Sequence, residues 1–191
     1  MHDTTYKIRN PDKVPVDIYL DIEKRSEYRH EYLKGKLRAM AGASLAHNVI
    51  CTNIVSGLRP HLAEGCLIMA SDMKVRVHDD IFYYPDVLIS CEDFTNQYYS
   101  HEPCVVVEVL SETTARKDLE EKLINYKDMY SLRLYLLVDS RKPMVMGYYR
   151  HHTTDDTKWL LRTFSEQDSI EIPCSNTPLT FEAIYESSTV A

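Results

Sequence analysis

The segment 103–111 carries one acidic side chain, Glu108, inside a run of apolar residues. The letters CVVVEVL, from Cys104 to Leu110, predict a β-strand that is buried on both faces. An unpaired buried carboxylate is costly, so such a group is normally paired, protonated or bound to a metal. Glu108 therefore needs a partner inside the fold.

A second acid, Asp86, lies in another strand-like run at 83–89. Two acids that converge from adjacent strands would form a site for a hard cation such as Mg²⁺. Other interpretations remain open at this point. Glu108 can be a strand-end residue bonded to a neighbouring Arg or Lys, and Asp86 can be a turn acid that follows Pro85.

The composition indicates one compact domain over 1–191, because 191 residues with 44% hydrophobic side chains can bury a sizeable core. We expect residues 1–13 to be loosely held. No apolar run is long enough to cross a membrane, and the N-terminus lacks the apolar part of a signal peptide. We therefore expect a cytoplasmic protein that does not associate with membranes.

Charge and cysteine content exclude some classes. A net charge of −7 argues against a protein that coats nucleic acid without specificity. The five cysteines form no C-x-x-C pair, so neither a zinc ribbon nor a disulfide framework is expected. Most of them lie in apolar runs, and we expect them to be small buried hydrophobic residues.

Hydrophobic periodicity predicts the order of elements. The N-terminal half should contain a helix at 16–28, a hairpin at 29–40 that turns at Lys34-Gly35, and a helix at 46–63 capped by Ser44 and shortened by Pro60. Strands at 66–69, 73–77 and 83–89 follow, then a polar loop at 92–102 and the Glu108 strand. The rest should contain a helix at 117–129, strands at 134–138, 144–149 and 159–164, and a short helix within 179–185.

The strand–helix–strand unit at 105–138 predicts a right-handed parallel crossover, whereas the other strands suggest antiparallel pairing. We expect an α/β (α+β) fold with a mixed β-sheet flanked by helices. An N-terminal helix and hairpin and a C-terminal antiparallel extension should complete it. In the helix at 117–129, Leu119, Leu123, Ile124 and Tyr126 are the expected buried residues.

Asp86, Glu108 and Lys122 together match the needs of metal-dependent phosphodiester hydrolysis. Carboxylates hold the cation, and a neighbouring lysine orients or helps to deprotonate the attacking water. Lys122 lies about one turn into the helix after the Glu108 strand, so its long side chain can reach back. The competing interpretation, which spacing alone favours, is a surface lysine paired with Asp118 at i,i+4.

The order of these motifs resembles the Uma-two family of restriction-endonuclease-like proteins, formerly a domain of unknown function, within the PD-(D/E)XK nuclease superfamily. The resemblance covers nearly the whole chain. It rests on Pro85-Asp86, on Glu108-Val-Leu-Ser111, and on Asp118 and Lys122 before Tyr126. Further matching segments are RHEYLKG at 29–35, MAGAS at 40–44 with His47-Asn48, and LYLLVD at 134–139.

The resemblance implies a role for each matching position. Asp86 and Glu108 would be catalytic acids and ligands of Mg²⁺ or Mn²⁺, and Lys122 the catalytic lysine. The superfamily's usual lysine position, two residues after the acid, is Leu110 here. Glu31 would support the metal or its water. His47 would lie near the site, although a histidine at the start of a helix more often makes a structural hydrogen bond. Ser111 and Asp118 would contact the metal ligands rather than the metal.

The implied function is a Mg²⁺-dependent endonuclease that hydrolyses DNA, and analogy with restriction nucleases implies a homodimer. Two alternatives stay open: a binding or regulatory protein that keeps the fold without the chemistry, and an enzyme for another phosphate-bearing substrate. Basic residues near the hairpin and beside the site could contact phosphates, although they alternate with acids as on an ordinary solvated surface. They are Lys24, Arg25, Arg29, Lys34, Lys36, Arg38, Arg116 and Lys117.

Overall fold

The computed structural model describes residues 13–112, 115–151 and 158–190. It confirms the mixed α+β class, with helices against mixed sheets. The strands are divided over two larger sheets and one short pair, rather than the single mixed sheet that we expected. The expectation of a loose segment at 1–13 falls, apart from Lys13, outside the described residues.

The larger sheet is mixed, and its central pair, β8 and β9, is parallel. In spatial order its strands are β11 (Trp159–Phe164), β10 (Val145–Arg150), β9 (Leu134–Asp139), β8 (Pro103–Leu110), β6 (Val87–Ser90) and β3 (Leu67–Ala70). Every residue of β8 is buried, as its continuous apolar run predicts. The parallel pairing of β8 and β9 confirms the parallel part of the predicted crossover.

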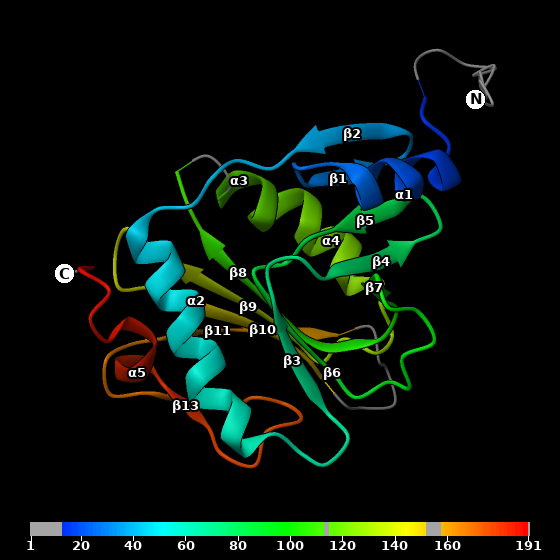
Figure 1. The fold of residues 1–191 in the computed structure, drawn as a ribbon. Coiled ribbons are helices and arrows are strands. Elements are labelled where there is room, and N and C mark those ends of the chain that lie inside the picture. Colours follow the sequence, from blue (N-terminus) through cyan, green and yellow to red (C-terminus); the bar gives the residue numbers. More distant parts are fainter. Residues whose placement is uncertain (1–12, 113–114, 152–157, 191) are drawn as a thin grey trace.

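Each face of this sheet has its own helix. Val105, Val107 and Val109 pack with helix α2 (Leu45–Leu58), beside which lies the C-terminal helix α5 (Phe181–Tyr185). Val106 and Leu110 pack on the other face with the helical segment 115–127. Figure 1 shows α2 across the front of the strands and α3–α4 on the opposite side. Side chains alternate between the two faces of a strand, so Glu108 points to the same face as Val106 and Leu110, toward the 115–127 segment.

The second sheet is built around the N-terminal hairpin. Its strands, in spatial order, are β2 (Lys36–Ala39), β1 (His30–Leu33), β5 (Ile81–Tyr83), β4 (Lys74–His78) and β7 (Tyr99–Ser100). Helix α1 (Val16–Arg25) covers it through Tyr19, which packs on Tyr32 and Phe82. The short pair β12 (Ser169–Ile170) and β13 (Leu179–Thr180) lies in the C-terminal segment.

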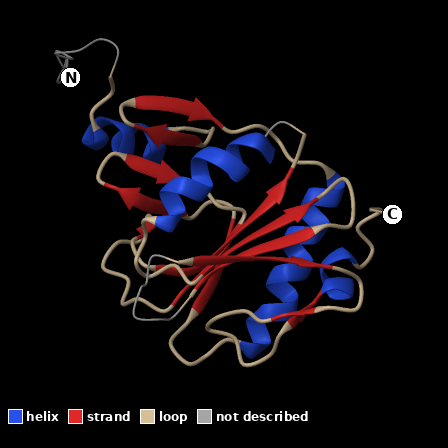
Figure 2. Ribbon diagram, turned by 180° about the vertical axis from the view of Figure 1, so that it is seen from behind, coloured by secondary structure: helices blue, strands red, loops and turns tan. Residues whose placement is uncertain are grey.

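The helical segment 115–127 lies between the two larger sheets (Figure 2). It consists of α3 (Ala115–Lys117), a π-helical stretch η2 (Asp118–Lys122) and α4 (Leu123–Lys127). The predicted helix at 117–129 is confirmed in place, but the burial expected for Ile124 is wrong, because that side chain is 66% exposed. The π stretch adds a residue to the turn and so shifts the phase of the helix that follows.

Several predicted boundaries are confirmed. The hairpin turns at Lys34 and Gly35, whose φ angles of 49° and 95° fit a tight turn with two left-handed residues. Ser44 caps α2 by accepting a hydrogen bond from the His47 backbone N at 3.2 Å. The helix ends at Leu58, where a 3₁₀ turn, η1 (Arg59–His61), contains Pro60.

Three expectations are wrong. The first helix ends at Arg25 rather than residue 28. The strand expected at 83–89 is two strands, β5 and β6, which belong to different sheets. The loop expected at 92–102 contains β7. The break at Tyr84-Pro85-Asp86 follows from Pro85, which lacks a backbone N–H and cannot continue a ladder inside a sheet.

The cysteines also differ from expectation. Disulfides join Cys66 to Cys91 and Cys104 to Cys174, and Cys51 is a free thiol. Local sequence gave no sign of this pairing, because the partners are 25 and 70 residues apart and only the folded sheet brings them together. Separately, no helix in the described part of the chain is long and apolar enough to span a membrane.

Candidate active site

The Glu108 carboxylate lies near the end of β8 and is almost fully buried, with 3% of the residue exposed. Lys122 supplies its closest partner, because the ammonium Nζ donates to Glu108 Oε1 at 2.7 Å. Tyr126 OH donates to the same oxygen at 3.3 Å. The partner that a buried carboxylate requires is therefore a lysine from the helix that follows the strand.

Lys122 is itself buried and lies among three carboxylates. Its Nζ is 2.7 Å from Glu108, 3.1 Å from Glu31 and 3.2 Å from Asp118. The interpretation of Lys122 as a surface lysine is thus wrong, although its pair with Asp118 does form. One oxygen of that carboxyl, Asp118 Oδ1, is buried without a hydrogen bond, so the ammonium lies within ion-pair range but not in hydrogen-bond geometry.

Glu31 brings the hairpin into the group. It lies on β1, as predicted, and its side chain bonds both Lys122 and Lys117. Next to it, Arg38 on β2 makes a two-pronged ion pair with Glu121, with N–O distances of 2.8 and 3.0 Å. The helical segment thus joins the two sheets through charged contacts.

Asp86 lies in the bend that directly precedes β6, and β6 is the strand next to β8. Val87 pairs with Val107 in the antiparallel pair of β6 and β8, so the next position along the register places Asp86 beside Glu108. Its Oδ2 accepts a hydrogen bond from Val109 N at 2.7 Å and lies 3.2 Å from His47 Nε2. Among the described residues, none donates a hydrogen bond to the other oxygen, Oδ1.

His47 lies in the first turn of α2 and reaches the group only through Asp86. Its other ring nitrogen, Nδ1, is 3.6 Å from the Cys51 sulfur. The three side chains His47, Cys51 and Asp86 lie close enough to share a metal ion. Burial raises the pKa of the Cys51 thiol, and the carboxylate of Asp86 adds to that shift, so a thiolate ligand is disfavoured here.

Ser111 lies outside the charged group. It follows β8 directly, and its carbonyl accepts a hydrogen bond from Ala115 N at 3.1 Å, at the start of the helical segment. The structure therefore brings Glu31, Glu108, Asp118 and Lys122 into direct contact. Asp86 and His47 form a second pair beside them.

The electrostatics of the group follow from its charge count. Glu31, Glu108, Asp118 and Glu121 contribute four carboxylates. They face three cations, namely the ammonium groups of Lys117 and Lys122 and the guanidinium of Arg38, which lies 3.9 Å from Glu31. Burial raises the pKa of Glu108 well above its usual value; Lys122 opposes that shift, and Asp118 and Asp86 reinforce it. Burial alone lowers the pKa of Lys122, but Glu108, Glu31 and Asp118 together raise it well above its usual value. The interior therefore holds a charged lysine and a surplus of negative charge.

Two contacts of this group were missed at the sequence level. Tyr126 was expected only as a core residue, yet its hydroxyl bonds Glu108. Lys117 was considered as a phosphate contact, but it bonds Glu31. The helical spacing from Lys122 to Tyr126 could have indicated the first, since side chains four residues apart share a face. The second could not be anticipated, because 86 residues separate the partners.

A separate surface cavity is lined by side chains of α1 and of the segment 69–74. None of the predicted catalytic or metal-binding residues lines it, although Lys24, Arg25 and Arg29, which were considered as phosphate contacts, do. Among its lining residues, Tyr84 OH accepts a hydrogen bond from Lys74 at 3.3 Å and donates one to Glu23 at 2.7 Å. This cavity therefore contributes nothing to the acid–lysine group.

A model of the Uma2 family, described as "Putative restriction endonuclease", matches residues 16–183. This chain belongs to the Uma2 family. Family membership confirms the resemblance seen in the motifs. The Uma2 description associates the chain with nucleases in general, and it names neither a metal nor the residues that act.

Two Uma2-like relatives come from Synechocystis sp. (strain ATCC 27184 / PCC 6803 / Kazusa). The uncharacterized protein slr1290 is 33% identical over 177 residues, with 91% of this chain and 92% of that protein covered. The uncharacterized protein sll1609 is 30% identical over 149 residues, with 75% and 82% covered. They support the family assignment but report no activity.

The Uma2 chain also has a solved structural neighbour, described as a "putative nuclease belonging to DUF820" from Anabaena variabilis. The two folds superpose with a TM-score of 0.70 over 92% of this chain and 99% of the other. Their sequences are 14% identical, so the comparison establishes the shared fold.

Proposed function

We propose that this protein is a Mg²⁺- or Mn²⁺-dependent endonuclease that hydrolyses DNA phosphodiester bonds, and that two copies act together as a dimer. The observation that carries the proposal is the buried contact of Lys122 with Glu108, beside Asp86 on the neighbouring strand. Family membership supports a nuclease in general. Two strands of DNA need two cuts, which is the reason for proposing a dimer.

The donor chemistry fits a hard divalent cation. Asp86 and Glu108 offer carboxylate oxygens, which Mg²⁺ prefers, and Mg²⁺ is commonly held by one or two carboxylates with the remaining positions left to water and phosphate. The surplus of buried carboxylates and the raised pKa of Glu108 both favour a bound cation. Asp86 Oδ1, which accepts no hydrogen bond from the described residues, and the Glu108 carboxylate would be the ligands.

The bound metal would supply Lewis acidity and a water that loses its proton more readily. Each remaining role belongs to the chain itself. Lys122 holds a positive charge against Glu108 and can offset charge on a phosphate. Glu31 and Asp118 fix the position of the Lys122 ammonium. His47 and the Val109 backbone N–H orient the carboxylate of Asp86.

Plasmid cleavage tests the proposal. Purified protein with Mg²⁺ or Mn²⁺ should nick or linearise DNA, while Asp86→Asn, Glu108→Gln and Lys122→Met should each lose at least about 100-fold in rate, the usual scale for a lost metal ligand or electrostatic stabiliser. Glu120→Gln is the matched control, because this side chain lies on the same helical segment but is 64% exposed, and within the described part of the chain its ion pair is with Arg116. Cleavage by Asp86→Asn at the wild-type rate would overturn the proposal.

The ion pairs of the basic residues favour a second candidate function, a non-catalytic binding or regulatory protein. Arg25, Arg29 and Arg116 are each engaged with an exposed acid, so they offer less charge to a phosphate backbone than their number suggests. Lys122 is also already bonded to an acid. A non-catalytic binding or regulatory protein would have these properties.

Calorimetric titration with Mn²⁺ separates the two candidates. The endonuclease proposal expects binding heat that Asp86→Asn removes, whereas a non-catalytic protein that lacks the metal site gives no heat. Replacing plasmid by RNA and by nucleotides in the cleavage assay distinguishes DNA from other phosphate-bearing substrates.

A further inference from the structure

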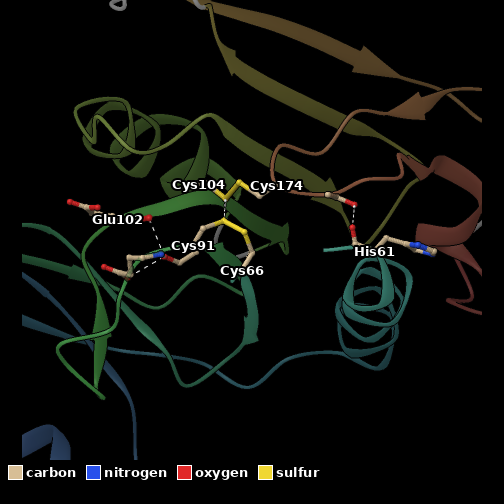
Figure 3. Close-up of a disulfide and its surroundings, with 9 residues drawn as sticks. His61, Cys66, Cys91, Glu102, Cys104 and Cys174 are labelled. Atoms are coloured by element: carbon tan, nitrogen blue, oxygen red, sulfur yellow. Dashed lines mark hydrogen bonds between the residues drawn. A yellow bond between two sulfur atoms is a disulfide. The ribbon is translucent and has the colours of Figure 1, made fainter. Parts of the chain in front are cut away.

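Four of the five cysteines gather at one place in the fold, at the far end of β8 from Glu108. Figure 3 shows Cys66, Cys91, Cys104 and Cys174 with their sulfur atoms turned toward one another. The Cys91 and Cys104 sulfurs are 4.0 Å apart, although they belong to different disulfides. Those of Cys66, Cys91 and Cys174 all lie within 4.8 Å of one another. We refer to these residues as the four-cysteine cluster.

Strand register explains the first three positions. Leu67 pairs with Ser90 at the end of β3 and β6, so Cys66 and Cys91 extend that pair by one residue. Between the pairs Ile89–Val105 and Ser90–Pro103 the register of β6 and β8 shifts, so Cys104 is the extra residue at this irregularity, and its sulfur lies 4.0 Å from that of Cys91. Three neighbouring strands thus bring one cysteine each to the same edge of the sheet.

The fourth cysteine comes from the C-terminal segment, which is fixed to the chain near residue 62. Ala63 N donates to the Cys174 carbonyl at 2.9 Å, and Leu62 forms a β-bridge with Ser175. Cys174 adopts a left-handed backbone with φ of 68°, which is unfavourable for a side chain other than glycine. Such a conformation persists where the surroundings dictate it, and here it directs the sulfur to the other three.

This spacing suits a shared metal ion. In a tetrahedral zinc site with Zn–S bonds of about 2.3 Å, neighbouring sulfurs are separated by about 3.8 Å. The 4.0 Å between Cys91 and Cys104, which no disulfide imposes, is close to that value. The Cα atoms of Cys104 and Cys174 are 7.1 Å apart, beyond the usual range for a disulfide pair.

We propose that the four-cysteine cluster, in its reduced state, binds one Zn²⁺ through four thiolates. Four sulfur ligands select zinc over the hard cations that carboxylates hold. Three of the sulfurs, those of Cys66, Cys91 and Cys174, lie within 4.8 Å of one another, and the Cys104 sulfur lies 4.0 Å from that of Cys91. With all four positions filled by protein, the zinc would be structural rather than catalytic. A thiol reductant first converts the two disulfides to four thiols by supplying four electrons and four protons, and it is itself oxidised to disulfide. Zn²⁺ then displaces the four thiol protons and joins the C-terminal segment to three strands.

The cluster is separate from the acid–lysine group. Cys104 and Glu108 are four residues apart on one strand, which corresponds to about 13 Å. Cys91 is exposed while Cys104 is buried, so the cluster lies at the surface and offers a path for the ion. The zinc proposal therefore stands whether or not the protein is a nuclease.

Metal and thiol analysis of the wild-type protein tests the proposal. Protein purified under reducing conditions without chelator should contain one zinc per chain by mass spectrometry of the metal. After denaturation with chelator it should show five reactive thiols, the full cysteine count. Chelator should lower the melting temperature of the folded protein, and Zn²⁺ should restore it. Replacement by Co²⁺ should give the visible absorption of tetrahedral thiolate coordination.

Cysteine variants locate the ion. Cys91→Ser and Cys104→Ser should lose the zinc, whereas Cys51→Ser should retain it, since Cys51 lies outside the cluster beside His47. The proposal is overturned if the reduced wild-type protein contains no zinc, or if iron is found in its place. It is also overturned if one thiol alone reacts, which would mean two permanent disulfides, or if zinc is lost with Cys51→Ser and retained with Cys91→Ser. Should the cluster variants fail to fold, the wild-type zinc content, thiol count and melting shift decide.

Discussion

Glu108 is the residue whose ionisation depends most on its surroundings. Its pKa is raised above the usual 4.5, chiefly by burial. An acid with a raised pKa binds its proton more tightly in the folded chain than in the unfolded one. It therefore stabilises the fold below pH 4.5, and that contribution is lost as the pH rises through the folded-state pKa.

Glu108→Gln should remove this pH dependence. Glutamine is neutral throughout, and its carbonyl can still accept the Lys122 hydrogen bond. Because burial disfavours the ionised form of Glu108 and raises its pKa, the variant should become more stable relative to the wild type as the pH rises from 5 to 8. Urea unfolding at the two pH values, without metal, measures it. Glu120→Gln should show no such gain, and a Glu108→Gln difference that shrinks with pH would contradict the expectation.

Among the elements, helix α2 positions His47, and Ser44 determines where that helix begins. The Ser44 hydroxyl accepts the backbone N–H of His47, whose ring then reaches Asp86. If this first turn frays, His47 moves and the Asp86 carboxylate loses the contact that holds its orientation. Stability and site geometry are therefore linked at this cap.

Ser44→Ala should cost about 1 kcal/mol of unfolding free energy, because an orphan backbone N–H loses its acceptor. Ser44→Gly is the matched comparison, since glycine at a cap costs only a few tenths of a kcal/mol relative to serine. Chemical denaturation of the three proteins gives the differences. No loss of stability in Ser44→Ala would mean that the hydroxyl contributes nothing at this position.

The elements also show where sequence reasoning succeeds and fails. The hairpin, the crossover and the buried β8 strand follow from local signals: a Lys-Gly turn, a strand–helix–strand order and a continuous apolar run. The strand at 83–89 was wrong because β5 and β6 have the same apolar character, and sheet membership is decided by distant partners. The exposure of Ile124 depends on a π stretch, which has no signature in the apolar spacing.

At the scale of the whole molecule, the candidate site exists only after both sheets have assembled. Residue types and order indicated Asp86, Glu108 and Lys122, but the contacts of Glu31 with Lys117 and Lys122 join segments 86 and 91 positions apart in the numbering. The cysteine cluster depends in the same way on strand register. The spacing of residues along the sequence cannot indicate either the acid–lysine contacts or the cysteine cluster.

Because these ligands meet only in the folded state, a cation that they hold must stabilise the fold. Binding to the native state alone contributes about 2.7 kcal/mol when the free ion is 100 times its dissociation constant, or about 5–10 °C in melting temperature for a chain of this size. We therefore expect saturating Mg²⁺ to raise the melting temperature of the wild type, and to leave Asp86→Asn and Glu108→Gln unchanged.

Scanning calorimetry of protein that carries one equivalent of zinc, with no free zinc in the buffer, isolates the Mg²⁺ effect, because thiolates do not compete for this hard cation. Cys91→Ser should respond to Mg²⁺ as the wild type does, since the cluster lies at the other end of β8. An equal rise in the wild type and in Asp86→Asn would instead indicate a general effect of salt on this chain of net charge −7. If Mg²⁺ does not change the melting temperature at all, the acid–lysine group is not a metal site. Protons would then neutralise the surplus negative charge of its buried carboxylates, and the group would serve only to stabilise the fold.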